Sequence, residues 1–138
     1  MLIDGTNLIL GRIATVAAKR ALEGETISIV NCEKIIITGS PRRLYEKFKE
    51  MQDKGGPYKG PFFPKMPDRI VKRVIRGMIP YKKERGAKAF KRIKCYIGVP
   101  DQFKTQKYEI VESADAAKLQ TLKFIKVGDL SKFYGKKF

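Results

Sequence analysis

The sequence predicts a single α/β domain, and three observations support this fold class. The chain has 138 residues, enough for one domain with a substantial hydrophobic core. Apolar residues make up 43% of the chain, as expected for a folded protein. Short β-branched segments are interspersed with segments in which apolar residues recur at helical spacing. This mixture indicates strands and helices packed around one core.

The first part of the chain predicts one helix and two strands. After a short apolar segment at 2–4, residues 11–22 place their apolar side chains, many of them alanines, on one broad face. This pattern predicts a helix that packs closely against a sheet, with Gly24 as its stop. Residues 26–30 and 35–38 are β-branched and almost continuously apolar. We therefore expect two strands that are covered on both faces.

The middle of the chain predicts another helix and then a long loop. Ser40 and Pro41 have the residue types of an N-cap and a first helical position, and the helix should run to about residue 53. Seven Gly and Pro residues interrupt 55–67 and exclude a regular element there. A loop of this length is either disordered or held by contacts with another group. We expect it to be mobile in the isolated protein.

Two amphipathic helices and a strand follow this loop. Residues 68–78 and about 83–92 each place apolar side chains on one face and Lys or Arg on the other. Pro80 ends the first of these helices. Residues 93–99 predict a third strand. Later in the chain, residues 122–127 and 129–134 have the patterns of a late strand and one or two helical turns.

Positive charge is concentrated in the segment of the two amphipathic helices. The formal net charge of the chain is +16, and Lys65–Lys94 carries twelve Lys or Arg residues against only Asp68 and Glu84. An acidic protein, a membrane surface or a nucleic acid could neutralise such an excess. Nucleic acid is the most general of these partners, because its phosphates are dense and release counterions on binding.

The candidate contacts to nucleic acid are the basic residues of the loop and helices, together with one arginine of the first helix. On the helix at 68–78 the only acidic residue is Asp68, so the repulsion among the four cations is largely uncompensated in isolation. The loop aromatics Tyr58, Phe62 and Phe63 either form a small satellite core or stack on unpaired bases. The predicted binding residues are Arg12, Lys59, Lys65, Arg69, Lys72, Arg73, Arg76, Lys82, Lys83, Arg85, Lys88, Lys91 and Arg92.

Several classes of function are disfavoured by residues that the chain lacks. It contains no His, so it has neither a Ser–His or Cys–His pair nor a histidine metal site. Neither glycine-rich phosphate-binding fingerprint is present. Cys32 and Cys95 lie in apolar segments and are interpreted as small buried hydrophobic residues. We expect no enzyme, metal, cofactor or small-molecule substrate, and no membrane span, since no apolar run approaches 18 residues.

Four strings, read together and in order, resemble one protein family. They are LGRIATVAAK at 10–19, VNCEKIIITG at 30–39, RGMIPYK at 76–82 followed by Arg85-Gly86, and KRIKCYIGVP at 91–100. This combination is similar to the universal large-subunit ribosomal protein family called L thirteen, over about residues 2–103. The compact start and the short tail resemble the archaeal or eukaryotic-type branch, with the archaeal form favoured.

The resemblance implies both a fold and a function. The fold would be a three-layer α/β/α single domain with a mostly parallel central sheet of about four strands. The function would be that of a cytoplasmic structural constituent of the large ribosomal subunit, which binds large-subunit rRNA, contacts neighbouring ribosomal proteins and supports assembly. The turn at 77–80, with its flanking basic residues, corresponds to the family's most characteristic RNA-side region; these residues are Arg76, Lys82, Lys83 and Arg85.

The sequence also predicts how the chain is divided and leaves two alternative functions to consider. Residues 1–103 should form the RNA-binding core, with the basic loop 55–67 and the basic helices within 68–92. Residues 104–138 should form a C-terminal extension packed on the core or on RNA. One alternative function is a regulatory RNA-binding module that acts outside the ribosome. The other, a small enzyme for an anionic substrate, is disfavoured by the missing His residues and fingerprints.

Overall fold

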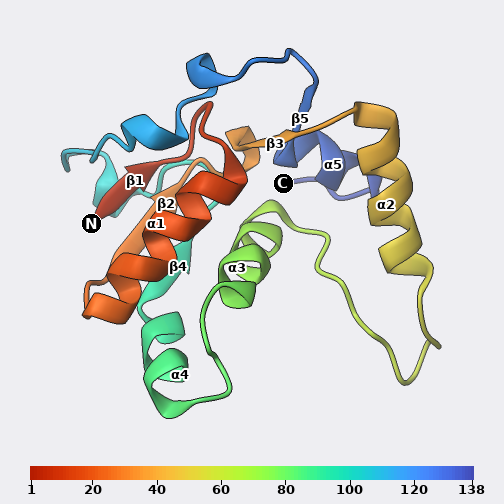
Figure 1. The fold of residues 1–138 in the computed structure, drawn as a ribbon, viewed down its shortest axis with the longest axis horizontal. Helices are drawn as coiled ribbons and strands as arrows, with labels where there is room; N and C mark the ends of the chain where they lie inside the picture. Colours follow the sequence, from red (N-terminus) through yellow and green to blue (C-terminus); the bar gives the residue numbers. More distant parts are fainter.

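Three parallel strands form the central sheet of the computed structural model, which describes all residues from 1 to 138. They are β1 (Leu2–Asp4), β2 (Ile27–Val30) and β4 (Ile93–Cys95), in the order β1-β2-β4. β2 is the middle strand and all four of its residues are buried. The α/β class with a mostly parallel sheet is confirmed (Figure 1). The parallel sheet has three strands, where about four were expected.

The strand predicted at 35–38 leaves this sheet. Asn31 has a left-handed backbone (φ 54°) and begins a 3-10 turn, η1 (Cys32–Lys34), which redirects the chain. β3 (Ile36–Thr38) then pairs antiparallel with β5 (Phe124–Lys126), the predicted late strand. Thr38 is exposed, so the prediction that this strand is covered on both faces was wrong. β3 instead belongs to a small second sheet that it forms with the tail.

The strand predicted at 93–99 keeps its backbone contacts beyond its regular part. β4 ends at Cys95, but the Tyr96 N–H donates to the Ile29 carbonyl (2.8 Å) and the Cys32 N–H to the Tyr96 carbonyl (3.1 Å). The turn at Asn31 interrupts the regular ladder here. The Asn31 side chain also donates a hydrogen bond of 2.9 Å to the carboxylate of Asp4, which fixes the turn against the end of β1.

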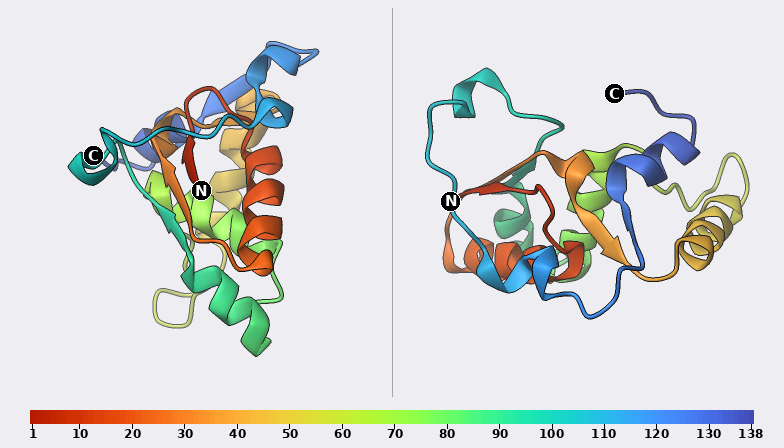
Figure 2. Two further views of the ribbon diagram at one scale, coloured as in Figure 1. Left: turned by 90° about the vertical axis from the view of Figure 1, so that its left-hand side faces the viewer. Right: turned by 90° about the horizontal axis from the view of Figure 1, so that it is seen from above.

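Helix α1 (Leu10–Glu23) confirms the prediction at 11–22. Its alanines at 14, 17 and 21 are completely buried, and their small side chains allow the close approach expected from the pattern. Gly24 ends the helix in the left-handed conformation (φ 111°), which glycine adopts without the steric cost of a Cβ. α1 lies on one face of the sheet and the segment containing η2 (Asp101–Phe103) on the other (Figure 2).

Three further helices follow the predicted positions within one or two residues. They are α2 (Pro41–Asp53), α3 (Pro67–Gly77) and α4 (Glu84–Lys91). α3 packs against α1, β4 and η1, and it buries Ile70, Val71 and Ile75. α2 has no fully buried residue and stands at the edge of the molecule, beyond α3 (Figure 1). The basic helix α3 is therefore part of the core as well as part of the surface.

The C-terminal extension packs into the same hydrophobic core. Val111, Ile125 and Leu130 belong to the main cluster of buried side chains, together with residues of α1 and the sheet. The tail is also tied to the N-terminal part by backbone hydrogen bonds, including Glu109 N–H to the Leu2 carbonyl (2.8 Å). Two 3-10 turns, η3 (Glu112–Ala114) and η4 (Ala116–Lys118), lead to β5 and α5 (Val127–Phe133).

The long loop at 55–67 is attached to the domain at its second half. The Ser131 hydroxyl of α5 donates a hydrogen bond of 2.6 Å to the Lys65 carbonyl, and the Arg73 guanidinium donates one of 3.2 Å to the Phe62 carbonyl. The first half closes on itself through Gly60 N–H to the Gly56 carbonyl (3.0 Å). α3 and α5 therefore provide contacts to the second half of the loop, and the mobility of the loop in the isolated protein stays a prediction.

Replacing Ser131 by alanine should lower the free energy of unfolding by about 1–2 kcal/mol, because it leaves the Lys65 carbonyl without its donor. The Ser131 side chain is completely buried, so water cannot easily replace the hydroxyl. Urea unfolding followed by circular dichroism measures the change. Ser113→Ala is the control, since Ser113 is exposed and only its backbone carbonyl makes a contact. Equal stability of the two variants would contradict the attachment.

The two cysteines lie at or near the core, as their apolar sequence neighbours predict. Both cysteines are free; Cys32 is completely buried and Cys95 partly so. A hydrogen bond with the neighbouring Cys95, together with burial, raises the pKa of the Cys32 thiol above its ordinary value, so it stays protonated. The interpretation of Cys32 as a buried hydrophobic residue is confirmed.

No helix of the protein combines the length and apolar character needed to span a bilayer.

Candidate nucleic-acid interface

Helix α3 provides the centre of the basic surface. Its apolar residues face the core, and helical spacing places four cations away from the buried stripe. These cations are Arg69, Lys72, Arg73 and Arg76. The structure contains five ion pairs and none involves these four side chains. Their positive charge is therefore not neutralised within the protein, which is the arrangement expected of a surface that meets an anion.

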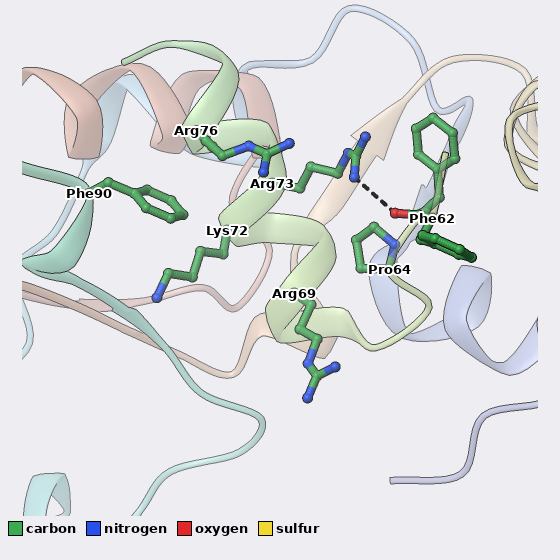
Figure 3. Close-up of a pocket in the computed structure, with 8 residues that line it drawn as sticks. Phe62, Pro64, Arg69, Lys72, Arg73, Arg76 and Phe90 are labelled. Atoms are coloured by element: carbon green, nitrogen blue, oxygen red, sulfur yellow. Dashed lines mark hydrogen bonds between the residues drawn. The ribbon is translucent and has the colours of Figure 1, made fainter. Parts of the chain in front are cut away.

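Arg73 is held in place by the loop that precedes the helix. Its guanidinium carbon lies 4.3 Å from the centre of the Phe63 ring, and one of its N–H groups donates to the Phe62 carbonyl (3.2 Å). Figure 3 shows this hydrogen bond and the side of Arg73 on which the loop lies. Stacking on a ring leaves the edge of a guanidinium free to donate hydrogen bonds. Arg73 is thus oriented and still has free N–H groups.

Lys72 and Arg76 make similar contacts on the other side of α3. The Lys72 ammonium lies 5.1 Å from the centre of the Phe90 ring of α4, and the Arg76 guanidinium lies 4.9 Å from that of Tyr81. Both distances are within the range of a cation–π contact. Three of the four α3 cations are therefore supported by an aromatic side chain. This support reduces the conformational entropy that an anion would have to remove on binding.

A shallow pocket lies among these side chains. Its volume is about 410 Å³, and its walls come from the end of the loop, the cationic face of α3 and one ring of α4 (Figure 3). The residues that line it are Phe62, Phe63, Pro64, Arg69, Lys72, Arg73, Arg76 and Phe90. Basic groups beside exposed rings can bind phosphates and stack on bases at the same time. We call this hollow the arginine pocket.

The remaining basic residues of the turn and α4 extend the surface. Lys82, Lys83, Arg85 and Lys91 are exposed. Lys88 forms an ion pair of 2.6 Å with Glu84, one helical turn earlier, so its charge is partly compensated. These predicted residues continue the positive surface from α3 over the turn to α4. Lys59 and Lys65 are exposed on the loop.

Arg12 and Arg92 have partners inside the protein that the sequence did not indicate. Arg12 donates to the Ser113 carbonyl (3.0 Å) and links α1 to the tail. Arg92 donates to the Ala21 carbonyl (3.3 Å), near the end of α1. Lys and Arg side chains commonly bind the last carbonyls of a helix in this way. Both arginines therefore have a structural role in the fold, in addition to any contact with nucleic acid.

The loop aromatics divide between the two interpretations left open by the sequence. Phe63 is partly buried and supports Arg73, as a satellite-core residue would. Tyr58 and Phe62 expose 94% and 69% of their surface. Such exposure leaves these two rings free to stack on a partner.

Two features of the surface were missed by the sequence analysis. One is Phe90, assigned only to the core face of its helix, which supports Lys72 and lines the arginine pocket. The other is a second group of cations at the C-terminus, where Lys132, Lys136 and Lys137 surround a hollow beside Phe138. The density of lysine in the last seven residues was the available signal. The structure has no cluster of three or more possible metal ligands.

The fold and this surface define a small α/β protein with a preformed, uncompensated basic face, a class suited to binding a polyanion. The family described as Ribosomal protein L13 matches residues 1–102. The chain therefore belongs to the ribosomal protein L13 family, and the family resemblance drawn from the four strings is confirmed. Because the members are structural ribosomal proteins, the expectation that the chain is not an enzyme is also confirmed.

Similar proteins from archaea align with almost the whole chain, including the tail. The large ribosomal subunit protein uL13 of Methanosarcina barkeri is 45% identical over 137 residues, which cover 99% of this chain and 98% of the relative. That of Methanococcoides burtonii is 42% identical over 136 residues, with 99% and 98% covered. That of Archaeoglobus fulgidus is 41% identical over 134 residues, with 96% and 86% covered. The alignments with these archaeal relatives therefore include the C-terminal extension.

Proposed function

We propose that this protein is a structural constituent of the large ribosomal subunit in the cytoplasm. It binds large-subunit rRNA, contacts neighbouring ribosomal proteins and supports assembly of the subunit. The observation that carries the proposal is the face of α3, where four cations have no acidic partner and three are positioned by aromatic rings. Membership of the ribosomal protein family identifies the polyanion that such a face would meet.

The chemistry of the surface favours phosphate as its main ligand. Three of the four α3 cations are arginines, whose planar guanidinium can make two parallel hydrogen bonds to one phosphate. The exposed cations of the turn and α4 extend the contact to further phosphates of the backbone. Arg12, Arg92 and the loop residues Lys59 and Lys65 lie at the margins of the contact, where the first two also support the fold.

We also infer that the extension at 104–138 acts chiefly through the fold of the core domain. Its side chains at 111, 125 and 130 belong to the main hydrophobic cluster, and α5 holds the loop of the basic surface. The extension would therefore stabilise the core domain at 1–103, and through it the RNA-binding surface. Its C-terminal lysines offer an additional contact with RNA at the edge of this surface.

Binding to large-subunit rRNA should depend steeply on salt. If on the order of 8–10 phosphates are contacted, the slope of log K against log salt concentration should be roughly −6 to −9, because each contact releases counterions. Filter binding of purified protein to large-subunit rRNA over a series of salt concentrations measures this slope. A slope near zero would contradict a phosphate-binding surface.

Sucrose-gradient sedimentation separates the ribosomal function from a regulatory role outside the ribosome. A subunit constituent should migrate with the large subunit even after a wash at high salt, since tertiary contacts with folded RNA add to the electrostatic ones. A free regulatory module would remain at the top of the gradient. The second outcome would favour the alternative function.

A further inference from the structure

We propose that a second hollow, between α2 and α3, binds a single unpaired nucleobase of the RNA, while the arginine pocket holds the adjoining phosphates. This inference rests on the proposed RNA-binding function and specifies the kind of RNA segment that the surface accepts. The hollow has a volume of about 260 Å³. It is lined by Phe48, Met51, Gln52, Phe63, Pro64, Ile70, Arg73, Val74 and Gly77. We call it the base pocket.

The walls of the base pocket are suited to a flat apolar ring. Phe48 and Met51 of α2 face Val74 of α3 across it, and all three are only partly buried. α2 leaves its apolar face incompletely covered, since none of its residues is fully buried. A base that leaves its stack is typically held between aromatic and apolar side chains. The pocket provides such surfaces on both sides.

One polar side chain in the base pocket has no partner in the protein. Gln52 is partly buried, lines the pocket and forms no side-chain hydrogen bond. Its amide can donate and accept at the same time, which matches the alternating donors and acceptors on the edge of a base. A purely apolar ligand would leave this group unsatisfied. Gln52 therefore favours a ligand with a polar edge, such as a nucleobase, over a purely apolar one.

The base pocket and the arginine pocket share a wall. Phe63, Pro64 and Arg73 line both hollows, and Arg73 is fixed there by its ring contact and its hydrogen bond. A nucleotide can thus place its base on one side of this wall and its phosphates on the other. A fully paired duplex could satisfy only the arginine pocket, because its bases stay within the helix. The two adjacent hollows indicate a bulged or single-stranded nucleotide.

The test compares short RNA hairpins that differ by one unpaired nucleotide. One hairpin is fully paired, and four others carry a single bulged A, C, G or U in the stem. We expect at least one bulged hairpin to bind the protein about tenfold more tightly than the paired hairpin, the size of effect produced by stacking one base. Filter binding at one fixed salt concentration measures the ratio of the two affinities.

Gly77 lines the base pocket, so Gly77→Leu adds a large side chain to its wall; no backbone clash results, since a Cβ added at Gly77 meets no atom within 4 Å. In this variant the ratio of bulged to paired affinity should fall to about one, because the stacking contribution is lost. Gly11→Leu is the matched control: a Cβ at Gly11 also meets no atom within 4 Å, and the residue lies on α1 away from both pockets. The control should keep the preference for the bulged hairpin.

Each contrary outcome identifies which proposal fails. Equal binding of all hairpins by the natural protein, or an unchanged preference in Gly77→Leu, would overturn the base pocket and leave RNA binding intact. Failure to bind any hairpin or large-subunit rRNA would overturn the proposed function as well. A photoreactive residue in place of Gln52, activated in assembled large subunits, should form an adduct with RNA. An adduct with a protein would overturn the inference and assign the pocket to a peptide segment.

Discussion

Gly86→Ala should destabilise the protein by about 3 kcal/mol and lower its melting temperature by roughly 10 °C. Gly86 is a buried residue of α4, and a Cβ there would clash with the Pro80 carbonyl oxygen and lie 3.0 Å from the Tyr81 nitrogen. Both atoms belong to the backbone of the turn between α3 and α4, so no side-chain rotation relieves the clash. The turn and α4 would have to separate, which exposes part of the core.

Gly77→Ala is the control for this prediction. Gly77 also lies in a helix, but a Cβ added there meets no atom within 4 Å. The alanine should leave stability unchanged or raise it by up to about 1 kcal/mol, because glycine loses more conformational entropy in a helix. Thermal unfolding followed by circular dichroism compares the two variants. If Gly86→Ala melts together with Gly77→Ala, α4 and the turn do not approach as closely as described.

The triple variant with Arg76, Lys82 and Arg85 all replaced by alanine should lose much of its affinity for RNA while its fold remains intact. Each lost phosphate contact makes the slope of log K against log salt less steep by about one, so the change should be about 2–3. Filter binding to large-subunit rRNA measures it. All three side chains are partly or fully exposed and none forms an ion pair, so their removal leaves the core untouched.

Melting temperature and a matched charge change distinguish binding from folding. The contact between Arg76 and Tyr81 lies at the surface and contributes about 0.5–1 kcal/mol, so the melting curve of the triple variant should stay close to that of the natural protein. Replacement of Lys107, Lys118 and Lys123 by alanine removes the same charge from exposed sites of the tail. This control should retain most of the affinity. A collapsed melting curve for the first variant would assign its residues to the fold.

Local patterns in the sequence were sufficient to predict most helices and the basic surface. α1 and α3 follow from apolar residues at helical spacing, and their ends agree within one or two residues with those predicted. The cations of α3 follow from the same spacing, because residues that alternate with a buried stripe must face outward. Short-range periodicity depends only on neighbouring residues, so it can be read without knowledge of the rest of the chain.

The partners of individual segments were not predictable in the same way. β3 has the composition of a central strand, yet a left-handed residue at Asn31 turns it toward β5, which comes far later in the chain. The hydrogen bond of Arg12 to Ser113 joins residues 101 positions apart. Such contacts depend on how distant segments meet. A basic residue that supports the fold and one that is free for RNA look alike in the sequence.

The sequence by itself determined that this chain is a basic α/β protein of the ribosomal protein L13 family, with its charge on one face of two consecutive helices. Helical periodicity and the order of short motifs are properties of the sequence, and both can be read without a structure. Only the tertiary structure decided which rings support the cations, how the tail completes the core, and that two pockets share the wall at Phe63 and Arg73. These features are created by contacts between segments that are distant in the chain.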